Sequence, residues 1–191
     1  MAPRTSAGGR APLPDCWGNP ESETYGIPLM HPIIKTVGAL NVALPSDREI
    51  LITRHFKAPR TLVWDAHTKP ILLKRWLLGP PGWTMPVCEV DLRVGGKYRY
   101  EWHGQGGLAM ALSGVYRAIE APSRIEDTQV FDDNWTQGPA DTTLLLFEDS
   151  AGTRLELTIL YASQEARDIA VATPMAEGME AGYARLENEV A

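Results

Sequence analysis

Residues 88–104 read CEVDLRVGGKYRYEWHG and carry the clearest strand pattern of the chain. From Lys97 to Trp102, aromatic side chains alternate with charged ones. Successive side chains of a β-strand point to opposite faces, so this alternation predicts a strand with one buried face. The Gly-Gly pair at 95–96 is typical of a tight hairpin turn. The stretch therefore predicts two antiparallel strands, the second of which carries aromatic rings on its inner face.

Short alternating segments continue on both sides of this hairpin. Turns rich in Gly, Pro, Ser and Asp separate them, and such regular spacing indicates a meandering antiparallel sheet. The expected strands are 49–56, 85–92, 97–102, 109–119, 124–131, 142–148 and 153–161, and the apolar stretch 33–44 is a candidate edge strand.

In two regions the apolar residues recur with the period of a helix rather than that of a strand. Two short helices are expected after Pro59 and after Pro70, and GPPG at 79–82 ends the second. Near the C-terminus one apolar stripe recurs at steps of three and four: Met175, Met179, Tyr183, Leu186 and Val190. A sheet with one solvated face needs its other face covered, and this last helix is long enough to cover it. The sequence therefore predicts an α+β fold in which a curved antiparallel sheet wraps around a C-terminal helix.

Composition and charge narrow the classes of protein. The chain has 191 residues and a formal net charge of -6, with no basic stripe, which argues against a nucleic-acid partner. It has two cysteines, Cys16 and Cys88, and no close spacing of metal ligands, so we expect neither a disulfide framework nor a metal or other cofactor. No apolar run is long enough for a membrane span and no secretory signal is evident, so a cytoplasmic protein is expected.

The domain boundary is expected near the first strand. Residues 1–32 are rich in Pro, Gly, Ser and Ala, a composition that indicates a flexible N-terminal extension. Residues 33–191 are expected to form the single ligand-binding domain.

Several stretches resemble a known family. They are ITRHFKAPRTLVWDAHTKPILLKRWLLGPPGW at 52–83, CEVDLRVGGKYRYEWHG at 88–104, GVYRAIEAPSRIEDTQVF at 114–131, GTRLELTILYASQEARD at 152–168 and GMEAGYARLENEV at 178–190. They are similar to the START/Bet v 1-like (SRPBCC) superfamily, and within it to bacterial homologues of the Hsp90 ATPase activator. The resemblance implies the helix-grip fold, with two short helices after the first core strand and an internal cavity. It implies little about chemistry, because members include lipid and hormone carriers, cyclases and proteins that sequester toxic molecules.

Aromatic and methionine side chains are the main ligand-binding candidates. Aromatic rings give large apolar area with few rotamers, and methionine adapts to irregular shapes. Together with one amide, the candidates are Trp83, Tyr98, Tyr100, Trp102, Met110, Tyr116, Gln129, Phe131, Trp135, Met175, Met179 and Tyr183. The alternative is that these side chains simply fill a solid core.

Asp127 is the main polar candidate. It shares strand parity with Gln129 and Phe131, so an inward orientation would bring a carboxylate and an amide into the cavity. A buried carboxylate shifts its pKa or finds a partner, which makes Asp127 a candidate general acid–base or ligand anchor. The alternative is a position at the rim of the cavity, where Asp127 pairs with an arginine or with water. Tyr98 and His103 are the other catalytic candidates, although His103 shares the parity of the charged residues on its strand and is expected on the solvated face.

Three functions remain open at this point. The favoured one is binding of a small hydrophobic or aromatic molecule in the cavity, in a carrier, sequestering or sensing role, with homodimerisation left open. The second is an enzyme of the cyclase or dehydratase type that uses the cavity as its active site. The third is a chaperone-related or regulatory interaction module with a filled core.

Overall fold

The computed structural model describes residues 31–79 and 81–190, so nearly all of the expected extension lies outside the described part. The described residues form nine strands, four α-helices and one short 3-10 turn. In chain order these are β1 (Ile33–Val37), β2 (Leu40–Ala43), β3 (Glu49–Phe56), α1 (Arg60–Thr68), α2 (Pro70–Trp76), β4 (Thr84–Val90), β5 (Lys97–His103), η1 (Gln105–Gly107), β6 (Ala109–Glu120), β7 (Arg124–Phe131), β8 (Ala140–Asp149), β9 (Gly152–Leu160), α3 (Gln164–Ala172) and α4 (Met175–Val190).

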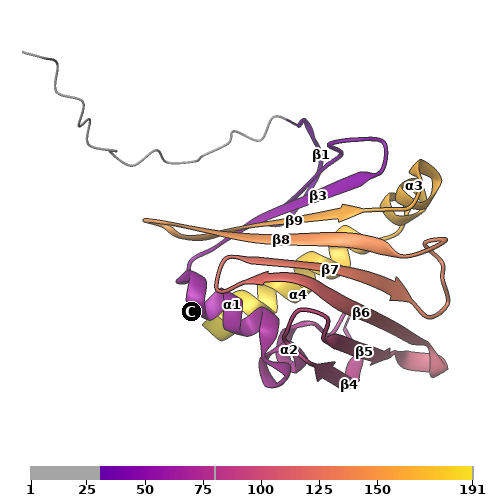
Figure 1. The fold of residues 1–191 in the computed structure, drawn as a ribbon, viewed down its shortest axis with the longest axis horizontal. Coiled ribbons are helices and arrows are strands. Elements are labelled where there is room, and N and C mark those ends of the chain that lie inside the picture. Colours follow the sequence, from indigo (N-terminus) through magenta and orange to yellow (C-terminus); the bar gives the residue numbers. More distant parts are fainter. Residues whose placement is uncertain (1–30, 80, 191) are drawn as a thin grey trace, which may run out of the picture. The chain divides into compact units, whose positions relative to one another are not determined.

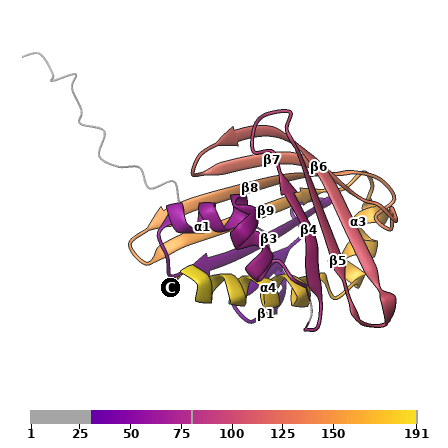
Figure 2. The same ribbon diagram turned by 90° about the horizontal axis from the view of Figure 1, so that it is seen from below.

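All nine strands belong to one antiparallel sheet with the order β1-β2-β3-β9-β8-β7-β6-β5-β4 (Figure 1). Strands β4 to β9 follow one another as a meander, and β9 then pairs with β3. The segment α1–α2 connects β3 to β4, which lie far apart in the sheet order. Figure 2 shows this segment and α4 on the same side of the curved sheet. The expected α+β helix-grip architecture is therefore confirmed.

The stretch 33–44 contains two strands rather than one. Val37 pairs with Leu40 across a two-residue turn, so β1 and β2 form a hairpin at the edge of the sheet. Gly38 has a φ of +56, which favours glycine, and a Cβ there would lie 2.7 Å from Glu180 Oε1. The turn lacks the Asn-Gly or Asp-Gly pair that marks many such hairpins, which explains why the sequence did not reveal it.

An ionic contact joins α4 to the middle of β3. The side chain of Arg54 points from β3 toward α4. Its guanidinium contacts the carboxylates of Glu180 and Glu187, which lie two turns apart on the same face of the helix, each at 2.9 Å. Only 2% of the Arg54 side chain is exposed, so its permanent charge depends on these partners. The guanidinium also lies over the ring of Phe56, 4.6 Å from its centroid.

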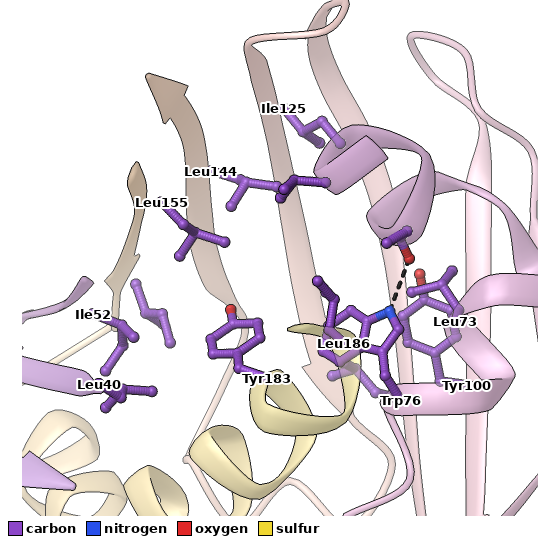
Figure 3. Packing of buried hydrophobic residues seen from close by; sticks show 14 of the residues in the cluster. Leu40, Ile52, Leu73, Trp76, Tyr100, Ile125, Leu144, Leu155, Tyr183 and Leu186 are labelled. Atoms are coloured by element: carbon purple, nitrogen blue, oxygen red, sulfur yellow. Dashed lines mark hydrogen bonds between the residues drawn. The ribbon is translucent and has the colours of Figure 1, made fainter. Parts of the chain in front are cut away.

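The apolar side of α4 packs between β3 and α2. Tyr183 meets the ring of Phe56 edge-on at 5.6 Å and stacks on Trp76 at 5.5 Å, while Leu186 is completely buried (Figure 3). Trp76 in turn donates its indole N–H to the carbonyl of Ala66 on α1 at 2.9 Å. These contacts form a dry core beneath α4. Within the described residues, no helix has the length and hydrophobicity needed to cross a membrane.

Replacing Arg54 tests how α4 is held. Arg54→Ala leaves Glu180 and Glu187 without their cation next to the core, and we expect a loss of about 3 kcal/mol in the free energy of unfolding. The control is Arg117→Ala, because Arg117 forms an exposed pair with Asp141, and its removal is expected to cost less than about 1 kcal/mol. Urea unfolding measures both values, and equal losses would contradict the assignment of Arg54 as the anchor.

Candidate functional site

Four aromatic side chains form a continuous layer on the concave face of the sheet. Tyr98, Tyr100 and Trp102 point inward from β5, and Tyr116 joins them from β6. The ring of Tyr98 lies 5.0 Å from Tyr100 and 5.1 Å from Tyr116, and Tyr100 meets Trp102 at 5.9 Å. We call these four residues the aromatic layer. The alternation of β5 predicted this inward orientation, and the burial of its three rings agrees with it.

Gly114 allows Tyr98 to lie flat across the neighbouring strand. The two residues are direct partners in the β5–β6 pairing. A Cβ built on Gly114 would lie 2.2 Å from Cζ of Tyr98, a distance at which no side chain fits. The missing side chain therefore lets the tyrosine ring cross β6 and place its hydroxyl above β7.

The hydroxyl of Tyr98 belongs to a buried cluster of polar side chains. It donates a hydrogen bond to Asp127 Oδ1 at 2.8 Å, and the hydroxyl of Thr142 donates to Asp127 Oδ2 at 2.7 Å. The β7–β8 register pairs Asp127 directly with Thr142. The side-chain oxygen of Gln129 lies 3.4 Å from the Tyr98 hydroxyl. We call Tyr98, Asp127, Gln129 and Thr142 the polar cluster.

Burial controls the protonation of the polar cluster. It raises the pKa of Asp127, and the hydrogen bonds from Thr142 and Tyr98 only partly offset this. Burial and the nearby carboxyl of Asp127 raise the pKa of Tyr98 well above its ordinary value. The high pKa of Tyr98 keeps its hydroxyl protonated, so that it donates to Asp127.

Side chains around the aromatic layer keep a small exposed fraction that the core beneath α4 lacks. On β4 to β8 these fractions lie between 4% and 8% for Cys88, Tyr98, Tyr100, Trp102, Leu112, Tyr116, Ile125, Asp127, Thr142 and Leu144. Beneath α4 they lie between 0% and 4% for Leu40, Ile50, Ile52, Phe56, Trp76, Leu155, Ala176, Tyr183 and Leu186, and most of these values are 0%. On β8 itself the value drops from 8% at Leu144 to 2% at Leu146. The side chains over the tyrosines therefore keep slightly more surface than most of those under α4.

A second group of predicted residues lies at one end of the sheet, where β5 joins β6 and β7 joins β8. Met110 pairs with Trp102, and the rings of Phe131 and Trp135 are 5.1 Å apart. Trp83 lies against the backbone of Gly104, where a Cβ would come within 2.5 Å of the indole. All four side chains (Trp83, Met110, Phe131 and Trp135) are half-buried. They border the aromatic layer on the side of these connections.

The predicted residues of the last helix lie elsewhere. Met175 lines a small pocket of about 20 Å³ together with Ile34, Lys35, Val42, Val171, Thr173 and Ala176, so it faces β1 and β2. Tyr183 belongs to the dry core, and Met179 is half-buried against that core. The neighbour of the aromatic layer is instead α2. Trp102 donates to the carbonyl of Leu77 at 2.6 Å, and Figure 3 shows Tyr100 beside Leu73 and Trp76.

Of the three catalytic candidates, the structure brings two together. Tyr98 and Asp127 share a hydrogen bond, whereas His103 is exposed and follows the opposite parity on β5. Sequence reasoning missed Thr142, the second hydroxyl on Asp127. Its parity with Leu144 and Leu146 indicated an inward side chain, but only the strand register shows which residue it meets.

A curved antiparallel sheet closed by a C-terminal helix, with rings on its inner face, defines a helix-grip protein. The family model described as "Activator of Hsp90 ATPase homolog 1-like protein" matches residues 57–191, and the chain belongs to this family.

Solved structures agree with this membership. A Rhodobacter sphaeroides protein is 32% identical, with a TM-score of 0.75, over 80% of this chain and 97% of that chain. A Chromobacterium violaceum protein is 29% identical, with a TM-score of 0.62, over 74% and 96% of the two chains. A Mycobacterium smegmatis protein is 25% identical, with a TM-score of 0.66, over 76% and 91%. No curated protein matches the chain.

A methyl group at residue 114 should disrupt the polar cluster. Gly114→Ala pushes Tyr98 away from Asp127, and we expect a loss of about 1–3 kcal/mol in unfolding free energy together with a changed near-UV tyrosine signal. Gly178→Ala is the matched control, because nothing lies within 4 Å of a Cβ at that position of α4. It is expected to stabilise the protein by about 0.5–1 kcal/mol. If Gly114→Ala were as harmless as the control, the close approach of Tyr98 would be wrong.

The pH dependence of stability should differ in sign between two aspartates. The pKa of Asp127 is raised, so its contribution to stability is full below the unfolded pKa, near 3.8, and is lost as the pH rises through the folded pKa. Asp127→Asn should therefore gain stability relative to wild type as the pH rises from about 4 through the folded pKa of Asp127. The exposed Asp132 has its pKa lowered by Arg99, so its contribution is lost as the pH falls. Urea unfolding of Asp127→Asn and Asp132→Asn across this range should give opposite trends, and parallel trends would refute the account.

Proposed function

We propose that the protein binds a small hydrophobic or aromatic molecule against the aromatic layer, as a carrier, sequestering or sensing protein. The observation that carries the proposal is the contrast in exposed fraction between the aromatic layer and the core beneath α4. The four rings of the aromatic layer keep between 4% and 8% of their surface, whereas most side chains beneath α4 keep none. This residual surface on inward-facing rings supports a site that a small molecule can reach.

The composition of this surface also supports binding. Ligand sites are mostly apolar with a few placed polar groups. Here the aromatic layer, Leu112, Ile125 and Leu144 supply the apolar surface, and the polar cluster supplies the groups that orient a ligand. The half-buried Trp83, Met110, Phe131 and Trp135 lie at the end of the sheet where a ligand could enter between the connections.

A second candidate function, an enzyme of the cyclase or dehydratase type, has one observation in its favour. The hydroxyl of Tyr98 lies 2.8 Å from Asp127 Oδ1 on the inner face, as in an acid–base pair. However, the Tyr98 proton is donated to Asp127, the high pKa of Tyr98 disfavours its ionisation, and His103 lies on the outer face. These arrangements suit orientation of a ligand better than proton transfer.

A chaperone-related or regulatory role would need a contiguous exposed apolar surface. The most exposed large apolar side chains of the described residues lie on separate elements: Ile71 on α2, Val94 in the β4–β5 turn and Leu108 before β6. This dispersion favours the binding role over an interaction module.

Filling the space over the tyrosines should abolish binding. Leu144→Trp adds a large ring on the inner face of β8, and we expect it to weaken binding of a neutral aromatic probe, 2-naphthylmethanol, by about tenfold or more. Leu145→Trp is the control, because residue 145 points to the other face of the same strand. Equilibrium dialysis gives the affinities, and amide NMR shifts show whether the probe contacts β5 to β8.

The proposal fails if a broader panel of lipids and aromatic compounds shows no binding in dialysis and native mass spectrometry. It also fails if both tryptophan variants bind the probe as well as wild type does.

A further inference from the structure

We propose that the site prefers ligands that carry an amine, and that Asp127 imposes this preference. The inference rests on the proposed function and specifies the class of ligand. It follows from the balance of donors, acceptors and charge around the polar cluster.

The polar cluster has more acceptors than donors. A carboxylate can accept about four hydrogen bonds, and Asp127 accepts two, from Tyr98 and Thr142. Each of these hydroxyls has one proton, and both protons are used on Asp127. A further polar partner of the carboxylate must therefore be a donor. Gln129 adds a side-chain oxygen 3.4 Å from the Tyr98 hydroxyl, although its amide can rotate to present a donor instead.

Asp127 also lacks a buried cation. The other buried charged residues among those described are Arg54 and Arg167. Arg54 is paired with two glutamates of α4, and Arg167 contacts Asp168 at 2.7 Å. Arg117 forms an exposed pair with Asp141 at 3.0 Å. The carboxylate thus accepts hydrogen bonds from neutral donors alone, and the charge of Arg117, which lowers the pKa of Asp127, is shared with Asp141. A ligand ammonium group would complete this arrangement.

The surrounding rings add to the preference for a cation. Tyr98 contacts the carboxylate, Tyr116 is the partner of Asp127 in the β6–β7 pairing, and Tyr100 packs on Tyr98. The faces of aromatic rings attract ammonium groups, more strongly when water is excluded. An anionic ligand such as a carboxylic acid would meet the opposite situation. It would bring a second negative charge next to Asp127 with no cation between them.

Three ligands of the same shape test the inference: 2-naphthylmethylamine, 2-naphthylmethanol and 2-naphthoic acid. Equilibrium dialysis at neutral pH compares their affinities for wild type, Asp127→Asn and Asp132→Asn. Asp132→Asn is the matched control, since it makes the same charge change on an exposed residue next to β7. For wild type and the control, we expect the amine to bind about tenfold or more tighter than the acid, with the alcohol between them. For Asp127→Asn, we expect the three affinities to converge.

Two results overturn the inference. The first is that the acid binds wild type as tightly as the amine does. This comparison needs no variant, so the test stays valid if Asp127→Asn fails to fold. A preference for the amine that persists in Asp127→Asn assigns the selectivity to another group. In both cases binding itself survives, and the proposed function stands. If none of the three ligands binds wild type but the broader panel yields a ligand, the inference fails and the proposed function stands. If the broader panel yields no ligand either, both fail.

Discussion

The hydrogen bond from Tyr98 to Asp127 is the interaction on which the inner face of the sheet depends. It links β5 to β7 across β6, and it forms only because Gly114 has no side chain to keep the ring away. Tyr100 and Tyr116 pack on the ring held in this way, so the position of one hydroxyl orders a whole aromatic surface. Burial of the carboxylate is the cost of this arrangement, and Thr142 offsets part of it.

The aromatic layer and the dry core beneath α4 belong to one hydrophobic cluster. Arg54 and the aromatic contacts of Tyr183 hold α4 against β3 and α2. The aromatic layer lies farther along the curved sheet, next to α2 and the connections that follow β5 and β7. The contacts that hold α4 are thus distinct from the ring contacts within the aromatic layer.

Much of the architecture could be predicted from the sequence because the strands carry a clear period of two. Alternation located β4 to β9 and gave the inward face of Tyr98, Tyr100 and Trp102, as well as the parity of Asp127. Periodicity gives the face of a side chain but not its partner on the next strand. The contact of Asp127 with Thr142 therefore required the register, and the role of Gly114 required the position of the Tyr98 ring.

Other features were hidden for different reasons. Arg54 points inward, although a charged residue is normally expected on the solvated face. Its two partners lie more than a hundred residues away in the sequence, so the sequence did not indicate that the charge is paired. The apolar stripe of the last helix indicated burial but not which strands it meets, and Met175 faces β1 and β2 rather than the tyrosines. The β1–β2 hairpin lacks a typical turn sequence.

The most direct test of the central claim is a crystal structure of the protein under xenon pressure, because xenon enters apolar cavities without needing any specific chemistry. The account predicts xenon bound between the aromatic layer and the side chains of Leu112, Ile125 and Leu144. Xenon found nowhere on this face, or only in the small pocket beside Met175, would show that the rings form a closed core and would contradict the account.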